Sequence, residues 1–111
     1  MVTITEDIIQ EITARIVEYA NPVRVVLFGS CARGEIGRDS DVDLLVIEDK
    51  PFTPEHSRST EAVSLRHVLN GLGVPVDILV YTEDEAEYWR DATNHVVWAA
   101  LREGKMLYER S

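Results

Sequence analysis

Two aspartates near the start of an apolar run have the spacing of a metal site. Asp41 and Asp43 flank Val42 at the start of the run that ends at Ile47. Alternate residues of a strand point to the same face, so we expect the two Cα atoms about 6.5 Å apart, with both carboxylates on one side. Like charges this close repel each other unless a cation lies between them, and oxygen ligands favour a hard cation such as Mg²⁺ or Mn²⁺.

A third carboxylate, Asp77, lies within the apolar run from Val76 to Val80. A carboxylate among core residues is costly unless it is paired or bound to a metal. We therefore expect Asp77 to complete the site of Asp41 and Asp43, provided that the two strands are neighbours. Taken alone, the first two aspartates could simply cap a turn before a strand.

A turn of small residues after an earlier apolar run could bind phosphate. Gly29 and Ser30 end that run and open a predicted short helix. A helix N-terminus offers free N–H groups and the positive end of a dipole, Gly29 lets the backbone approach closely, and Ser30 adds a hydroxyl. Arg33 either contacts phosphate or pairs with Asp41 or Glu35. A phosphate cradle beside a carboxylate metal site is what metal-assisted transfer of a phosphate group requires.

The elements that must position these residues alternate along the chain. Apolar spacing, β-branched runs and Pro or Gly breaks predict strands at 23–28, 41–47, 74–81 and 105–108, and helices at about 4–19, 53–70, 82–89 and 96–104. The expected helix starts are capping boxes at Thr3 with Glu6 and at Thr82 with Glu85, and a Thr53 cap before Pro54. We expect the first two strands to be buried on both faces.

This alternation predicts one α/β domain over residues 1–111, with a small mixed sheet packed with helices. The chain has 111 residues, 11 Lys and Arg and 20 Asp and Glu, for a net charge of −9. Such acidity argues against binding of a nucleic-acid backbone or an anionic membrane, and favours a basic protein partner or a bound cation. The chain shows no signal peptide and no apolar run of about 20 residues, so the expected compartment is the cytoplasm.

Gly29-Ser30 followed by Asp41-x-Asp43 resembles the signature of the DNA polymerase beta nucleotidyltransferase superfamily. The flanking residues 28–34 and 40–46 are similar to those of its smallest branch, the minimal nucleotidyltransferases. Val76-Asp77-Ile78 matches the third carboxylate of that branch, and residues 104–108 resemble its usual ending. The resemblance covers nearly the whole chain.

The resemblance implies a nucleotidyltransferase fold and an antitoxin that transfers AMP from ATP to a tyrosine of a HEPN-domain ribonuclease toxin, in a complex with that toxin. It implies that Gly29 and Ser30 hold the triphosphate and that Asp41 and Asp43 bind Mg²⁺. Asp77 would bind a second Mg²⁺ ion and help to activate the acceptor hydroxyl.

Two other functions remain open. The chain could transfer a nucleotide to a small molecule such as an aminoglycoside, although a chain of this length has little room for a second domain to bind one. It could also be an antitoxin that blocks its toxin by contact alone, although three carboxylates at these positions favour catalysis.

Overall fold

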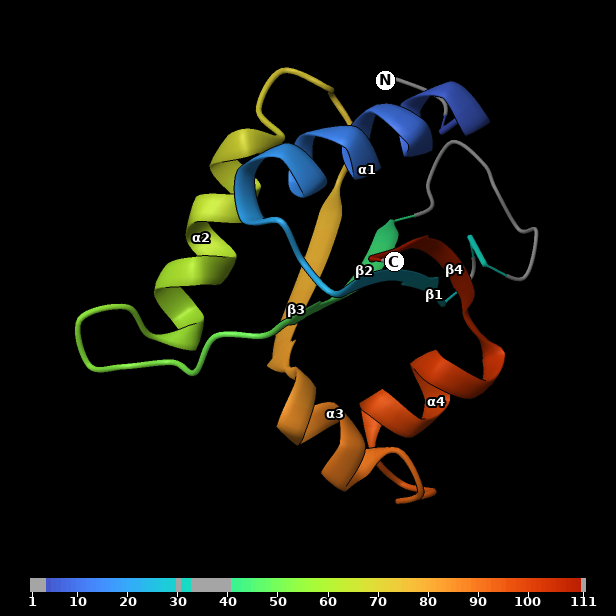
Figure 1. Cartoon of the computed structure of the whole chain (residues 1–111). Helices are drawn as coiled ribbons and strands as arrows, with labels where there is room; N and C mark the ends of the chain where they lie inside the picture. The colour runs from blue at the N-terminus through green and yellow to red at the C-terminus, as the bar shows by residue number, and fades with distance from the viewer. Residues whose placement is uncertain (1–3, 30, 33–40, 111) are drawn as a thin grey trace.

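The computed structural model describes residues 4–29, 31–32 and 41–110 of the chain (Figure 1). Its four strands form one mixed sheet in the order β3-β2-β1-β4. Strand β1 pairs antiparallel with both β2 and β4, whereas β2 and β3 run parallel. The strands are β1 (Arg24–Phe28), β2 (Val42–Glu48), β3 (Val76–Thr82) and β4 (Lys105–Glu109). The predicted small mixed sheet is confirmed, and β2 lies inside it with β3 at one edge.

Helices cover both faces of this sheet (Figure 1). They are α1 (Glu6–Ala20), α2 (Arg58–Val68), α3 (Glu83–Trp89) and α4 (Val96–Glu103). Helices α1 and α2 enclose the larger core with one face of the sheet, and this core contains Ile12, Leu44 and Leu65. Helices α3 and α4 enclose the smaller core on the other face, around Leu45 and Val97.

The expectation that β1 and β2 are buried on both faces is confirmed. Their central residues contribute to both cores, with Val25 and Leu44 in the larger and Val26 and Leu45 in the smaller. The expectation that Asp77 lies among core residues is wrong. β3 is an edge strand that alternates between buried and exposed residues, and Asp77 is on its exposed side.

The helix ends follow capping chemistry, though not always at the expected residue. The capping box of Thr82 and Glu85 is confirmed. Helix α1 begins after Thr5, whose hydroxyl accepts the Ile8 N–H, and not at the expected cap Thr3, which lies outside the described residues.

Helix α2 is capped by Ser57 rather than Thr53. The Thr53 hydroxyl instead accepts the His56 N–H at 3.0 Å, which closes a separate turn ahead of the helix. A Ser or Thr hydroxyl can accept a backbone N–H either in a turn or at a helix start. The sequence alone does not show which hydroxyl caps the helix.

One polar residue joins α2, β3 and α3. Arg58 donates to the Val80 carbonyl at 2.7 Å and to both carboxylate oxygens of Glu85, and its guanidinium lies 4.8 Å from the ring centroids of Phe52 and Tyr81. This contact fixes the last part of β3 against both helices. Among the described residues, no helix is long and apolar enough to cross a membrane.

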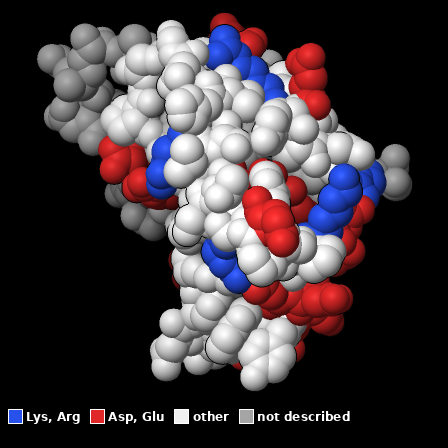
Figure 2. Space-filling model, turned by 90° about the vertical axis from the view of Figure 1, so that its left-hand side faces the viewer, with Lys and Arg blue, Asp and Glu red and all other residues white. Residues whose placement is uncertain are grey.

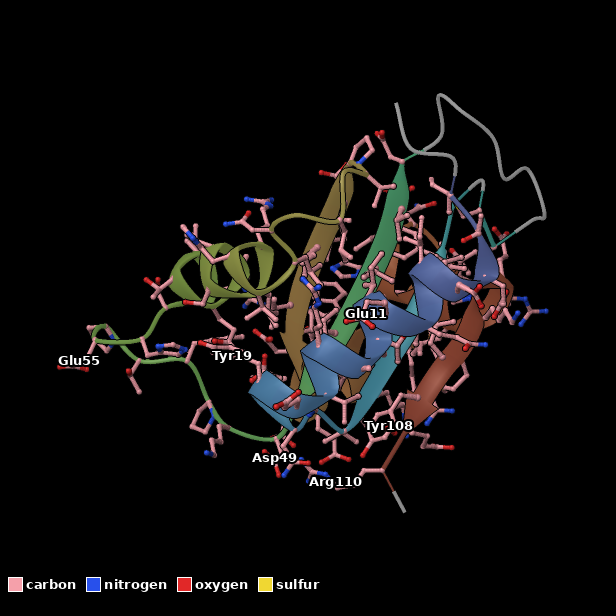
Figure 3. All side chains as sticks on the ribbon, turned by 90° about the horizontal axis from the view of Figure 1, so that it is seen from above. Glu11, Tyr19, Asp49, Glu55, Tyr108 and Arg110 are labelled. Carbon is pink, nitrogen blue, oxygen red and sulfur yellow. The ribbon has the colours of Figure 1, made fainter. Side chains whose placement is uncertain are left out.

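At the end of β2, the protein holds two carboxyl groups against each other. Glu61 of α2 is 4% exposed and accepts from the His56 ring at 2.8 Å. Burial, followed by a hydrogen bond and the charge of Glu61, raises the pKa of Glu48 to about 8. At neutral pH, Glu48 therefore remains protonated in the folded chain. Figure 3 shows the neighbouring Asp49 and Arg110, whose ion pair of 2.8 Å holds the C-terminal residues against this end of the sheet.

The raised pKa of Glu48 makes stability depend on pH. The folded state binds this proton more tightly than the unfolded state, so its contribution is complete below the unfolded pKa near 4.5 and is lost as pH rises through about 8. We expect Glu48→Gln to raise the melting temperature at pH 8.5 by about 4 °C or more, equivalent to about 1 kcal/mol. The substitution should have little effect at pH 5. Melting curves at both pH values test this, with exposed Glu103→Gln as the control; an equal effect of Glu48→Gln at both pH values would contradict it.

Candidate active site

The strand register brings two of the candidate carboxylates side by side. Asp43 is the Cα partner of Asp77 across the parallel β2–β3 pair, and of Phe28 across the β1–β2 pair. The neighbours of Asp43 and Asp77 along their strands, Leu44 and Ile78, belong to the core beneath α1 and α2. Because side chains alternate along a strand, Asp43 and Asp77 both point to the opposite face, which carries α3 and α4.

Asp41 lies at the same end of the sheet, one residue before β2. The Val42 N–H donates to the Pro75 carbonyl at 2.9 Å, which continues the β2–β3 pairing to the point where Asp41 leaves it. Asp41 is exposed, Asp43 is half-buried and Asp77 is exposed. Helix α3 follows the other end of β3, whereas α4 ends directly before β4, whose first residue Lys105 pairs with Leu27 (Figure 1).

The charges of Asp41 and Asp77 act on Asp43. The pKa of Asp43 is raised above its ordinary value, first by burial and then by the charges of Asp77 and Asp41. No basic side chain of the described residues forms an ion pair with any of the three. A cation at this end of the sheet would relieve that repulsion.

Gly29 places the main chain directly against Asp43. Its φ of +74° lies in the left-handed region, which residues other than glycine rarely adopt. A Cβ atom at this position would lie 2.3 Å from the Asp43 Oδ2. The structure thus shows a close backbone approach that needs glycine here, and the group being approached is the central carboxylate; the approach to phosphate stays a prediction.

Cys31 ties the turn after Gly29 to the start of β2. It is 3% exposed, and its Sγ donates to the Asp41 carbonyl at 3.1 Å. Burial raises the pKa of the thiol, with smaller contributions from the charges of Asp43 and Asp41. Cys31 is thus a small packed side chain that holds the turn beside the carboxylates.

The donor set suits Mg²⁺ bound together with a phosphate-containing substrate. Among the described residues, no three His, Cys, Asp or Glu side chains stand close enough to hold a metal ion by themselves. Mg²⁺ is usually held by one or two carboxylates, waters and substrate phosphates rather than by a complete protein cage. The adjacent pair of Asp43 and Asp77, with Asp41 beside it, meets that requirement.

Four of the six candidate residues from the sequence are therefore gathered at one end of the sheet: Gly29, Asp41, Asp43 and Asp77. Ser30 and Arg33 lie outside the described residues, as does the rest of the predicted short helix after Ala32. Sequence reasoning missed the pair of Glu48 and Glu61, because nothing in the local pattern shows that a helix brings one beside the other.

Comparison with known families gives a match over most of the chain. Residues 8–99 match the model of the nucleotidyltransferase domain. This span includes every candidate residue named above. No curated protein matches the chain.

Several solved structures share the fold. A structure described as a nucleotidyltransferase from Sulfolobus solfataricus has a TM-score of 0.62 and 20% identity, over 94% of this chain and 79% of that one. A toxin–antitoxin structure with AMP-PNP has a TM-score of 0.58 and 21% identity, over 92% and 74%. Spectinomycin adenyltransferase from Enterococcus faecialis, with ATP and spectinomycin, has a TM-score of 0.66 and 14% identity. That match covers 97% of this chain but 57% of the enzyme, so the chain corresponds to little more than half of it.

The contact between Gly29 and Asp43 can be tested against a second glycine. Gly71 also has a positive φ, of +93°, but an added Cβ there would meet nothing within 4 Å. Both Gly→Ala variants carry backbone strain of about 1 kcal/mol, and only Gly29→Ala adds a clash. We expect Gly29→Ala to lower the free energy of unfolding by about 1–2 kcal/mol more than Gly71→Ala does.

Chemical denaturation of the two variants measures this difference. In an Asp43→Ala background, which removes the carboxylate that the new Cβ would meet, the extra cost at Gly29 should shrink. Equal costs at the two glycines, or an extra cost that persists without the Asp43 carboxylate, would contradict the close contact.

Proposed function

The chain belongs to the nucleotidyltransferase domain family, and we propose that it is an antitoxin that transfers AMP from ATP to a tyrosine of a HEPN-domain ribonuclease toxin. The observation that carries this proposal is the placement of Asp41, Asp43 and Asp77 at one end of the sheet, beside the turn at Gly29. Carboxylates that repel one another beside a close backbone approach suit a nucleoside triphosphate and its cations.

The proposal gives each residue a distinct part. Asp41 and Asp43 would hold one Mg²⁺ ion, and Asp43 with Asp77 a second; when bound, these ions supply positive charge to the attacking and leaving oxygens. Gly29 and Ser30 would hold the triphosphate, and Arg33 would contact its phosphates. The acceptor hydroxyl then attacks the α-phosphorus while pyrophosphate leaves.

Asp77 suits the acceptor side of this reaction. It is exposed on the edge strand β3, whereas Asp43 is half-buried between β1 and β3. An acceptor hydroxyl approaching from solvent can reach Asp77, which would orient it and accept its proton. A carboxylate in hydrogen-bond reach of the acceptor is the usual requirement for such a general base.

A protein acceptor is favoured over a small molecule. Asp41 and Asp77 are exposed and Asp43 is half-buried, so the surface of a protein acceptor could reach these carboxylates from solvent. The toxin–antitoxin structure with AMP-PNP supports such a partner. The net charge of −9 also suits a protein that binds RNA through a basic face.

Transfer to a small molecule is the second candidate, because the spectinomycin adenyltransferase shares the fold. The match covers 57% of that enzyme at 14% identity, so it supports a shared fold rather than a shared acceptor. Inhibition by contact alone is the third, and the arrangement of carboxylates gives it no specific support.

The decisive experiment is labelling with ATP that carries ³²P at its α-phosphate. The chain should label the co-expressed HEPN-domain protein in Mg²⁺ and not in EDTA. Asp43→Asn should lower the labelling about a hundredfold or more, since it removes charge that holds Mg²⁺ at the reacting phosphate. Exposed Asp84→Asn, on α3, should leave it unchanged.

Three outcomes would contradict the proposal. Full labelling by Asp43→Asn would remove the carboxylates from the mechanism. Labelling of spectinomycin but not of the protein would favour a small-molecule acceptor. Inhibition of the ribonuclease without any label would favour an antitoxin that acts by contact alone.

A further inference from the structure

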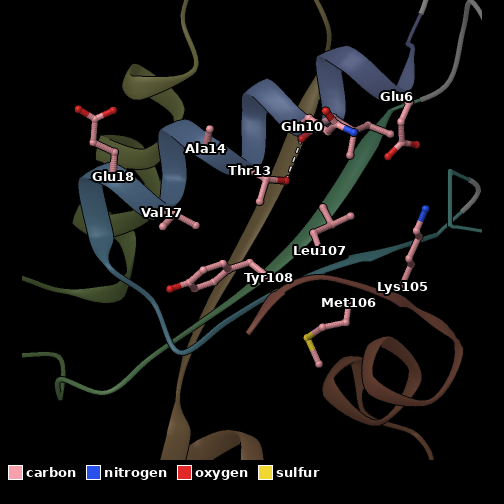
Figure 4. A pocket seen from close by; sticks show the side chains of 11 residues that line it. Glu6, Gln10, Thr13, Ala14, Val17, Glu18, Lys105, Met106, Leu107 and Tyr108 are labelled. Atoms are coloured by element: carbon pink, nitrogen blue, oxygen red, sulfur yellow. Dashed lines mark hydrogen bonds between the residues drawn. The ribbon is translucent and has the colours of Figure 1, made fainter. Parts of the chain in front are cut away.

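A groove of about 570 Å³ lies between α1 and β4, on the face of the sheet opposite Asp43 and Asp77 (Figure 4). Thr13 and Val17 of α1 point across it toward Leu107 and Tyr108 of β4 (Figure 4). These side chains are only half-buried, although Leu107 and Tyr108 pack against the larger core. The core beneath α1 is therefore open to solvent along this side.

The groove runs beside an unpaired sheet edge. β4 is the last strand of the sheet, and within the described chain it pairs only with β1. Edge strands present free N–H and C=O groups to which an extended segment can add, and here the middle of the strand is apolar. Met106, the second residue of β4, is 45% exposed.

Charge decides between a second copy of the chain and a different partner. A second copy would bring another net charge of −9 and be repelled. Glu6 and Glu18 line the two ends of the groove on α1, and Lys105 on β4 partly offsets the charge of Glu6 (Figure 4). The acidic character is not confined to this side, since Figure 2 shows carboxylates also gathering over the face that carries α2, β3 and α3. The complementary ligand is apolar in the middle and basic at its ends.

The dimensions also fit an extended segment. Twelve helical steps from Glu6 to Glu18 span roughly 18 Å, at a rise of about 1.5 Å per residue. A strand of about five residues covers roughly 17 Å. We propose that a basic protein partner adds an extended segment to β4 as a further strand, with its apolar side chains in the groove and basic residues near Glu6 and Glu18.

This inference rests on the proposed function in one respect: the basic partner that binds β4 is the same protein that accepts AMP. Lys105, the first residue of β4, pairs with Leu27 of β1. The residue after Leu27, Phe28, pairs with Asp43 of β2. β4 therefore begins at the carboxylate end of the sheet. A strand added to β4 would lie three strand spacings, roughly 14 Å, from β2. The partner would thus be anchored near the carboxylates while their own face stays open to the acceptor hydroxyl.

A defined peptide tests the docking surface without any transfer reaction. The probe has the centre Val-Ser-Val-Ser-Val with two lysines at each end, and the control probe carries glutamates in place of the lysines. In an NMR titration of the full chain, the lysine peptide should shift the amide signals of Thr13, Val17 and residues 106–108. It should also slow amide hydrogen exchange in β4, because strand addition pairs the free edge.

Matched variants make the outcome decisive. Gln10→Trp, at an exposed position that lines the groove, should weaken peptide binding tenfold or more, whereas Ser59→Trp, exposed on α2, should not. Glu18→Gln should weaken binding of the lysine peptide and reduce its dependence on salt.

Several results would overturn the inference. These are no saturable binding, equal binding by Gln10→Trp and the unmodified chain, equal binding of the glutamate peptide, or shifts at β3 in place of β4. Shifts in the groove without slower exchange in β4 would indicate a helical occupant and overturn strand addition. Loss of peptide binding would leave AMP transfer by the Asp43 site to be judged by its own assay, so the two proposals fail separately.

Discussion

Like-charge repulsion among Asp41, Asp43 and Asp77 is the constraint around which this end of the sheet is built. Among the described residues, no basic side chain pairs with these acids. Instead, the register of β2 and β3 fixes Asp43 beside Asp77, and that register is determined by core residues such as Leu44 and Ile78 that face the other way. The stability of the core therefore holds the carboxylates in an arrangement that a bound cation or a proton would relieve.

The sheet topology gives its parts different tasks. β2 is the inner strand that carries Asp43, and Gly29 at the end of β1 closes against it. β3, at one edge, presents Asp77 to solvent, and β4, at the other edge, leaves its apolar middle beside the groove under α1. We propose that nucleotide transfer takes place on one face of the sheet and that the partner binds on the opposite face. β1 lies between β2, which carries Asp43, and β4, which lines the groove.

Much of this arrangement could be predicted from the sequence, and the residues show why. The uniform runs of β1 and β2 identify strands buried on both faces, and the small residues after Phe28 identify a turn with a close approach. The prediction that Asp77 is buried is wrong, because an apolar run does not reveal whether its strand lies inside a sheet or at its edge. The helix starts at Thr5 and Ser57 were missed since several hydroxyl residues compete for each cap, and the pairing of Glu48 with Glu61 depends on tertiary contact alone.

The central claim is that the three carboxylates at the start of β2 and β3 form one cation site. Mn²⁺ is paramagnetic and broadens the NMR signals of nuclei close to it, so it locates such a site directly. Substoichiometric Mn²⁺ in the presence of a non-hydrolysable ATP analogue should broaden the amide signals of Gly29, Asp43 and Asp77 first, and the broadening should be lost in an Asp43→Asn, Asp77→Asn double variant. Broadening centred elsewhere, such as at Glu48 and Glu61, or unchanged in the double variant, would contradict the account.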